Sequence, residues 1–198
     1  MMSYSLVGVG TSWGGLAALS KLLRDLPADF GLPVVVVQHR GKDSDWLLAE
    51  LLQDTTDLKV CEVEDKEPLT PGMVHIAPAN YHMLVDDGYL SLTLEEPVRF
   101  SRPSIDVMFT SAADTYGPRA IGVVLTGANE DGARGLADIV KRGGLALVQN
   151  PRTAEIPIMP RAAVKAVPNA EILELDALAP RLIELSHERA NVGVRQTV

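Results

Sequence analysis

Apolar residues in this chain alternate between short unbroken runs and faces with helical spacing. Two runs are typical of strands, "SLVGVG" at 5–10 and "PVVVVQ" at 33–38, and the second has four consecutive valines. A run without polar alternation indicates a strand covered on both faces. Between these runs, leucines recur at helical spacing until Pro27, which ends the predicted helix. The chain therefore begins with a strand–helix–strand unit.

The same alternation continues along the rest of the chain. Further strands are expected at 58–63, 120–125, 145–149 and 171–175, and further helices at 42–54, 104–116, 131–142, 160–167 and 176–188. Residues 73–94 differ, because apolar runs lie close together around "DDG" at 86–88, which is a hairpin signal. We predict a doubly wound α/β fold: an open, mostly parallel sheet with helices on both faces and an antiparallel β-ribbon at about 73–94.

Composition favours one globular domain. The chain has 198 residues, of which 46% are hydrophobic and 22% are charged. It shows no internal repeat, low-complexity segment or linker. We therefore expect one domain over residues 1–190, followed by a frayed tail over 191–198.

Charge and hydropathy exclude several classes of partner. The net charge is −8, and an acidic surface repels phosphate backbones, so nucleic acid is not an expected partner. The N-terminus lacks the features of a signal peptide, and no apolar run approaches the roughly 20 residues that span a membrane. We expect a cytoplasmic protein that is not inserted in a membrane. The single cysteine, Cys61, is expected to be a buried small hydrophobe, and no cysteine or histidine spacing suggests a metal.

Candidate chemistry gathers at the ends of three predicted strands. In open α/β sheets the functional crevice lies outside the carboxyl ends of the strands. Ser12 follows the first strand, His39 the second, and Asp131 the strand that ends at Leu125. A serine, a histidine and an aspartate that converge there can act as nucleophile, base and orienting acid.

Each of these residues also has an ordinary structural reading. Ser12 is a candidate N-cap for the helix that follows it, and Asp131 for helix 131–142. His39, taken alone, is also compatible with an ordinary surface histidine. The coincidence of all three types at one sheet edge favours the catalytic reading. The other histidines are expected to be structural: His75 and His82 in the ribbon, and His187 in the last helix.

The glycines around Ser12 suit either a phosphate cradle or an oxyanion site. Gly10 is expected to let the chain turn off the first strand, while Gly14 and Gly15 open the helix. Backbone N–H groups at that helix start can bind a phosphate or a developing oxyanion, and the pattern alone does not choose.

Nucleotide binding has partial support in this stretch. A Walker loop requires a lysine after its glycines, and "SWGGLA" has none. A dinucleotide-binding fold usually has an acidic residue at the end of its second strand, where this chain has Gln38 and His39. Arg40 could still bind a phosphorylated ribose, so NADP binding remains an alternative.

Six motifs in order resemble the catalytic domain of the CheB-type protein-glutamate methylesterases of bacterial chemosensory pathways. They are "GTSWGG" around Ser12, "VVQH" ending in His39, "IAPANYHM", "SRPSIDVMF", "LTGANEDGA" around Asp131, and "QNPRTAEIPIMPRAAV". The resemblance covers about residues 5–188, which is nearly the whole chain. Several separate motifs in order are far more specific than the glycine pattern alone.

The resemblance implies a serine esterase that needs no metal or organic cofactor. It makes Ser12 the nucleophile, His39 the general base and Asp131 the group that orients the base. The implied substrate is a glutamyl methyl ester on the cytoplasmic helices of a chemoreceptor-like protein, and the products are glutamate and methanol. Family members can also deamidate receptor glutamines. The implied oxyanion site and pocket contain Trp13, Gly14, Ala128 and Asn129.

The chain departs from the usual motifs of the family at several positions. Trp13 replaces a threonine, Ala128 and Asn129 replace a Met-Gly pair, Ile158 replaces a glycine, and Ser101 replaces a frequent histidine. These changes predict a reshaped pocket and affect substrate preference more than the triad.

Many relatives carry an N-terminal receiver domain, and this chain begins at the first catalytic strand. We therefore expect any regulation to come from a separate protein. A weakly active or inactive interaction module of a chemosensory system remains an alternative, because Trp13 and the altered "GANEDGA" loop lie at the site.

Overall fold

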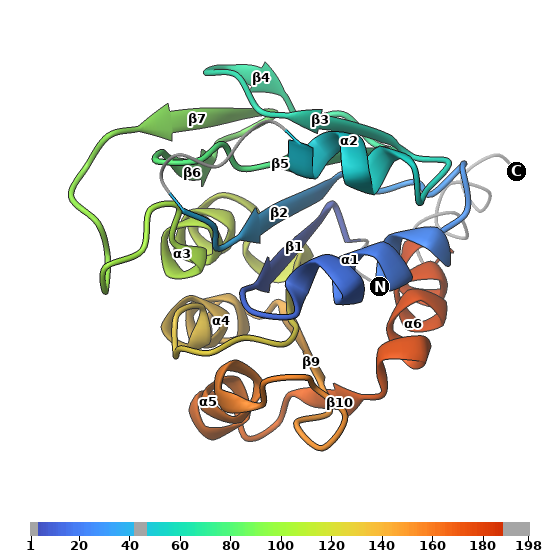
Figure 1. Ribbon diagram of the computed structural model, residues 1–198, viewed down its shortest axis with the longest axis vertical. Helices are drawn as coiled ribbons and strands as arrows, with labels where there is room; N and C mark the ends of the chain where they lie inside the picture. Colours follow the sequence, from blue (N-terminus) through green and yellow to red (C-terminus); the bar gives the residue numbers. More distant parts are fainter. Residues whose placement is uncertain (1–3, 42–46, 188–198) are drawn as a thin grey trace, which may run out of the picture.

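Seven parallel strands form the central sheet of the computed structural model, which describes residues 4–41 and 47–187 (Figure 1). Their spatial order is β10-β9-β8-β1-β2-β5-β3. Their bounds are β1 Leu6–Thr11, β2 Val34–Gln38, β3 Lys59–Glu62, β5 Met73–Ile76, β8 Ala120–Val124, β9 Leu145–Gln149 and β10 Glu171–Leu173. The chain adds β2, β5 and β3 on one side of β1 and then β8, β9 and β10 on the other side, so the strand order reverses at β1. In such sheets ligands bind at the carboxyl ends of the strands, where the order reverses.

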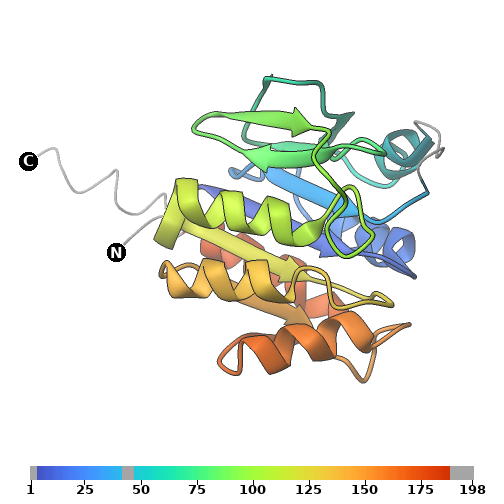
Figure 2. The ribbon, with the colours of Figure 1, turned by 90° about the vertical axis from the view of Figure 1, so that its left-hand side faces the viewer.

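Helices cover both faces of this sheet (Figures 1 and 2). On one face lie α1 Gly15–Arg24, α2 Leu47–Gln53 and α6 Leu175–His187; on the other lie α3 Ile105–Tyr116, α4 Ala133–Lys141 and α5 Ile158–Ala166. A short 3₁₀ helix, η1 Gly117–Arg119, leads into β8. In the part of the chain that the structure describes, no helix is long and apolar enough to cross a membrane.

The valine run in β2 shows why the sheet is covered on both sides. Val34 and Val36 belong to the hydrophobic cluster under α1 and α6, and Val35 and Val37 to the cluster under α3 and α4. All four are at most 1% exposed. Successive side chains of a strand point to opposite faces, so an unbroken apolar run requires two cores. The predicted fold class is therefore confirmed.

A second sheet, antiparallel and three-stranded, has the order β4-β7-β6 and packs on α3. Its strands are β4 Glu67–Pro68, β6 His82–Val85 and β7 Tyr89–Thr93. The β6–β7 hairpin turns at "DDG", where Gly88 has φ +84°. The prediction of a ribbon at 73–94 is thus confirmed for 82–93 and wrong for 73–76. Those four residues form β5, which pairs in parallel with β2 and β3, because a short apolar run does not reveal which partner it will find.

The structural alternative for Ser12 and Asp131, that they cap the helices that follow them, does not hold. Helix α1 begins after Gly14, which has φ +76°, and α4 begins after Gly132, which has φ +93°. Ser12 and Asp131 therefore precede these helices without capping them. Ser104 does cap α3, with its hydroxyl accepting from the Val107 N–H at 3.4 Å.

Two further expectations, the first part of the helix predicted at 42–54 and a frayed tail at 191–198, fall on residues outside the described part of the chain, which are 42–46 and 188–198.

Candidate active site

The carboxyl ends of β1 and β2 place Ser12 and His39 side by side. Thr11 and Gln38 are register partners at the ends of these strands, and each candidate residue follows directly. The His39 N–H donates to the Thr11 carbonyl at 3.0 Å, and the Ser12 N–H donates to the Thr126 carbonyl at 3.0 Å. The second bond joins the turn after β1 to the loop after β8. The predicted convergence of three strand ends is therefore present.

Gly10 was predicted to let the chain turn off the first strand, and this prediction was wrong. It lies inside β1, which extends to Thr11, so the chain does not turn there. A Cβ atom on Gly10 would clash with Ile105 Cγ2, at the start of α3. The missing side chain lets α3 approach the strand, which brings the N-terminus of that helix to the site.

The Asp131 carboxylate is held by four hydrogen-bonding groups. Oδ2 lies 2.8 Å from His39 Nε2 and accepts from the Ile105 N–H at 2.6 Å. Oδ1 accepts from the Ser104 hydroxyl at 2.9 Å and from the Asp106 N–H at 3.1 Å. Three of these donors belong to the start of α3, where backbone N–H groups and the helix dipole favour an anion.

A second aspartate, Asp106, makes the reciprocal contact: it lies in α3 and binds the start of α4. Asp106 Oδ1 accepts from the Gly132 N–H at 3.0 Å and from the Gly135 N–H at 2.8 Å, at the start of α4. Asp131, two residues before α4, thus binds the N-terminus of α3, and Asp106, in the first turn of α3, binds the N-terminus of α4. This role of Asp106 could not be predicted from the sequence, where an aspartate in a first helical turn indicates only a helix start.

The two buried aspartates have opposite pKa shifts. Burial alone raises the pKa of Asp131, but the His39 hydrogen bond and charge, with the Ile105 and Asp106 N–H groups, outweigh it and lower the pKa. For Asp106, burial raises the pKa, and the charge of Asp131 raises it further. The Gly135 N–H and the charge of Arg134 lower the pKa, but by less, so the net shift is upward. Asp131 is therefore the carboxylate that stays ionised beside His39.

The other ring nitrogen of His39 faces Asn129. The Asn129 Nδ2 lies 3.2 Å from His39 Nδ1, and Asn129 Oδ1 accepts from the Asp131 N–H at 3.1 Å. A backbone N–H can only donate, so this bond fixes which end of the amide points at the ring. Nδ1 therefore accepts, and Nε2–H donates to Asp131.

Ser12 is near His39 without being bonded to it. Within residues 4–41 and 47–187, the Ser12 hydroxyl makes no hydrogen bond, and the position it would take on the ring is occupied by Asn129. A hydrogen bond between the Ser12 hydroxyl and the His39 ring is therefore not formed in this structure. Catalytic hydrogen bonds are often long before substrate binds, so the geometry is compatible with catalysis.

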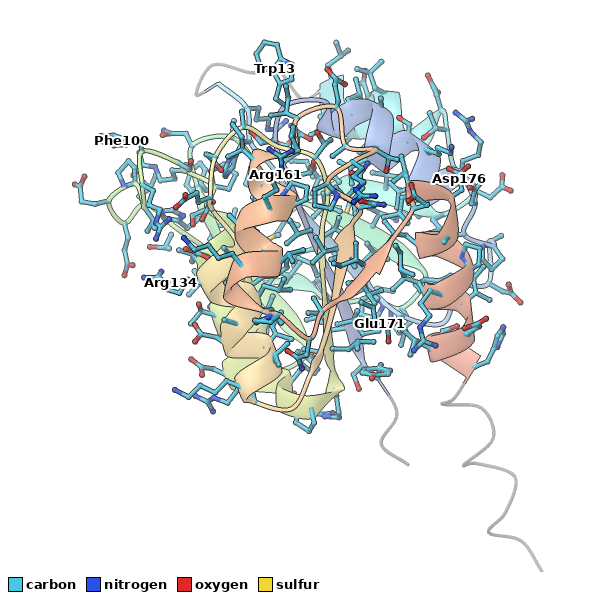
Figure 3. All side chains as sticks on the ribbon, turned by 90° about the horizontal axis from the view of Figure 1, so that it is seen from below. Trp13, Phe100, Arg134, Arg161, Glu171 and Asp176 are labelled. Carbon is cyan, nitrogen blue, oxygen red and sulfur yellow. The ribbon has the colours of Figure 1, made fainter. Side chains whose placement is uncertain are left out.

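The surface around His39 has two hollows. One, of ≈ 610 Å³, is lined by Ser12, Trp13, Gly14, Leu16 and His39 among others. The other, of ≈ 220 Å³, lies on the opposite side of His39 and includes Phe100. The Trp13 side chain is 66% exposed and Phe100 fully exposed, and both project from the molecule in Figure 3. An open, partly apolar surface on either side of a histidine suits a large substrate.

Four predicted pocket residues lie in the two turns beside Ser12, and their backbone N–H groups have no partner among the described residues. They are Trp13, Gly14, Ala128 and Asn129. Thr126 joins the turns, because its hydroxyl donates to the Trp13 carbonyl at 3.0 Å. Unpaired N–H groups on adjoining turns can stabilise a developing oxyanion.

The NADP alternative loses its main support. The guanidinium of Arg40 is 2.8 Å from Glu62 and donates to the Ala77 carbonyl at 3.0 Å, and its side chain is 8% exposed. An arginine engaged in this way does not present its charge to a ribose phosphate.

The structure also brings together a cysteine, an acid and a histidine that sequence spacing did not suggest as a metal site. Ligand atoms of Cys61, Glu67 and His75 lie within 4.8 Å of one another. The Thr70 N–H donates to His75 Nε2 at 3.3 Å, so the ring proton is on Nδ1, 3.6 Å from the Cys61 sulfur. Burial lowers the pKa of His75 and raises that of Cys61, which keeps both neutral. This arrangement is a structural hydrogen bond, as predicted for His75.

His82 is also structural, as the sequence analysis predicted. The Ser104 N–H donates to His82 Nδ1 at 3.2 Å, and Nε2 faces the Glu96 carbonyl at 3.1 Å. His82 therefore supports the start of α3.

Comparison with known proteins identifies the family of this chain. The sequence model described as CheB methylesterase matches residues 7–182. The chain belongs to the CheB methylesterase family. The crystal structure of the Thermotoga maritima CheB methylesterase catalytic domain superposes with a TM-score of 0.87 at 31% identity, covering 93% of this chain and 100% of that chain. The resemblance inferred from the six motifs is thereby confirmed.

Named relatives agree with this assignment. A Leptospira interrogans protein, named as a protein-glutamate methylesterase/protein-glutamine glutaminase, is 46% identical over 185 residues, which is 93% of this chain and 96% of the relative. The protein-glutamate methylesterase FrzG of Myxococcus xanthus is 39% identical over 182 residues, 91% of this chain but 54% of that relative. CheB-type proteins therefore exist both at about this length and with about as much additional sequence.

Proposed function

We propose that this protein is a serine esterase that removes methyl esters from glutamyl side chains of chemoreceptor-like proteins and releases methanol. Deamidation of receptor glutamines is the proposed second activity. The observation that carries the proposal is the 2.8 Å contact of His39 Nε2 with Asp131 beside Ser12. Family membership and the names of the relatives support the substrate class.

In this proposal Ser12 is the nucleophile, His39 the base and Asp131 the group that holds the imidazolium. His39 Nδ1 takes the Ser12 hydroxyl proton while Oγ bonds to the ester carbonyl carbon. The oxyanion binds N–H groups of Trp13, Gly14, Ala128 or Asn129. The tetrahedral intermediate then collapses, methanol leaves with the proton from His39, and a water activated by the same histidine hydrolyses the acyl-enzyme.

This chemistry requires no metal or organic cofactor, because each proton and electron pair is carried by side chains and substrate. We assign residues 1–190 to this domain. The proposed partners are the cytoplasmic helices of a methylated receptor and a separate regulatory protein, which places the reaction in the cytoplasm.

Replacement of the nucleophile tests the proposal directly. Ser12→Ala should abolish methanol release from methylated receptor and labelling by a fluorophosphonate probe, while the melting temperature stays near wild type. Ser186→Ala is the matched control, since among the described residues that hydroxyl donates to the Ile183 carbonyl within α6 and to no other group. Undiminished methanol release by Ser12→Ala would exclude this mechanism. Failure of the wild type to be labelled, with receptor binding that survives Ser12→Ala, would instead indicate an interaction module.

A further inference from the structure

The side chain of Asn129 is bonded to the ring nitrogen of His39 that does not face Asp131. Its amide has a single possible orientation, because Oδ1 accepts from the Asp131 N–H at 3.1 Å. Nδ2 then donates to His39 Nδ1 at 3.2 Å. The nitrogen that has to take the Ser12 proton is thus already engaged.

We propose that Asn129 is a positioning residue that fixes the tautomer of His39 and competes with Ser12 for its base nitrogen. This inference rests on the proposed function. With Nε2–H donating to Asp131, Nδ1 is the available base, and Asn129 stabilises this tautomer by donating to it. During catalysis the proton moves from Ser12 Oγ to Nδ1. A protonated Nδ1 and the Asn129 amide are then two donors facing each other, so the Nδ2–H···Nδ1 bond must break.

The loop between β8 and α4 allows this release without unfolding. Its first part is anchored, since the Gly127 N–H donates to the Ile156 carbonyl at 3.0 Å and its carbonyl accepts from the Met159 N–H at 3.0 Å. Its middle is open: Ala128 and Glu130 are exposed, and Asn129 is half-buried. Rotation of the Asn129 side chain is therefore sufficient to free Nδ1, and the backbone can stay in place.

The tautomer is measurable without any substrate. Two-bond ¹H–¹⁵N NMR spectra of the ¹⁵N-labelled chain distinguish a ring protonated at Nε2 from one protonated at Nδ1. We expect neutral His39, assigned by its loss in His39→Gln, to carry its proton on Nε2. A proton on Nδ1 would overturn the inference, whether or not the protein proves to be an esterase.

Variants of Asn129 with opposite expected effects test the competition. Asn129→Leu and Asn129→Gly remove the donor, so fluorophosphonate should label Ser12 faster by about 3- to 10-fold, the range for one neutral hydrogen bond. Asn129→Asp puts an acceptor at Nδ1 and holds a proton there, so labelling should slow by about tenfold or more. Glu130→Gln is the matched control in the same loop, because Glu130 is exposed and its carboxylate is 3.5 Å from Arg99; its labelling rate should not change.

A merely structural Asn129 would give a different pattern. All three substitutions would then slow labelling together, or leave it unchanged, and either result with wild-type melting temperatures would overturn the inference. The two proposals fail separately: an unlabelled wild-type Ser12 contradicts the esterase, while the tautomer measurement still decides the role of Asn129.

Discussion

On one side of His39, Asp131 is 1% exposed and bonded to His39 and three groups at the start of α3. On the other side, the Ser12 hydroxyl is unbonded within the described residues, and the neighbouring Trp13 is 66% exposed. The Asp131 side is thus part of the core, and the Ser12 side is part of the surface. Substitutions on the Asp131 side should affect fold and chemistry together, whereas those on the Ser12 side should affect chemistry and substrate choice alone.

The departures from the usual CheB-type motifs follow the same division. Trp13, Ala128 and Asn129 are all at least partly exposed, and all lie in the two turns beside Ser12, where we propose that the substrate binds. Asp131, Ser104 and Asp106, which interlock α3 and α4, lie within motifs that match the family. A change in the interlock alters the relative position of two helices, while a change in the turns alters only the surface that the substrate meets.

Loss of the Asp131 charge should have the largest effect. Asp131→Asn removes the anion that stabilises the imidazolium and presents an amide donor to a site already filled with donors. We expect kcat for methanol release to fall by about 10³- to 10⁴-fold. Steady-state assays with methylated receptor measure this. Asp138→Asn is the control, because Asp138 is half-buried in α4 and its amide replacement can still accept from the Thr110 hydroxyl, which lies 3.0 Å from Asp138 Oδ2. Retention of more than a tenth of wild-type kcat would show that Asp131 does not orient the base.

The second aspartate should affect stability more than chemistry. Asp106→Ala leaves the Gly132 and Gly135 N–H groups without their acceptor, and we expect a loss of about 1–3 kcal/mol in the free energy of unfolding. Asp106→Asn should cost less, because its amide oxygen can still accept both bonds and no charge is buried. Urea denaturation of the two variants measures the difference. Equal losses would mean that the charge, rather than the hydrogen bonds, maintains the interlock.

Replacement of Trp13 should affect substrate recognition and leave stability unchanged. Trp13→Ala removes an exposed aromatic surface, so we expect kcat/KM with the receptor to fall about 5- to 10-fold, the cost of a moderate contact residue. Labelling by a small fluorophosphonate and the melting temperature should stay near wild type. Phe100→Ala, at the second hollow, is a comparison variant. If labelling falls as much as kcat/KM, Trp13 acts on the nucleophile and not on substrate recognition.

Local patterns were sufficient to predict the framework and the ends of three strands. The valines of β2 and the helical spacing of leucines in α1 depend only on near neighbours in sequence, and the polar residue after each strand marks the crevice. This is why Ser12, His39 and Asp131 could be singled out together.

Long-range geometry accounts for what could not be predicted. The bonds from Asp106 to Gly132 and Gly135 join residues 26 and 29 positions apart, and no local pattern encodes the approach of α3 to α4. The same holds for Asn129 and His39, which are 90 positions apart. Gly10 was read as a turn because the contact that excludes its side chain comes from Ile105 on another element.

The smallest expected effect is the acid dependence of stability, where the two aspartates should oppose each other. The pKa of Asp131 in the folded state lies below its ordinary value of 3.8. Between the two values the unfolded chain binds more protons, so this group adds stability that is complete above pH 3.8 and is lost as the pH falls through the folded pKa. The pKa of Asp106 in the folded state lies above 3.8. There the folded chain binds more protons, so stability decreases as the pH rises from 3.8 through the raised pKa.

Urea denaturation from pH 3 to pH 7 separates these contributions. Relative to wild type, Asp131→Asn should lose less stability as the pH falls, because it lacks the group that must be protonated. Asp106→Asn should instead gain stability relative to wild type as the pH rises above 3.8, since it buries no carboxylate. The comparison is made between each variant and wild type at the same pH, so the surface carboxylates common to all three chains cancel. Parallel pH profiles for the two variants would contradict the opposite shifts, and with them the distinction between the aspartate that serves His39 and the one that holds α4.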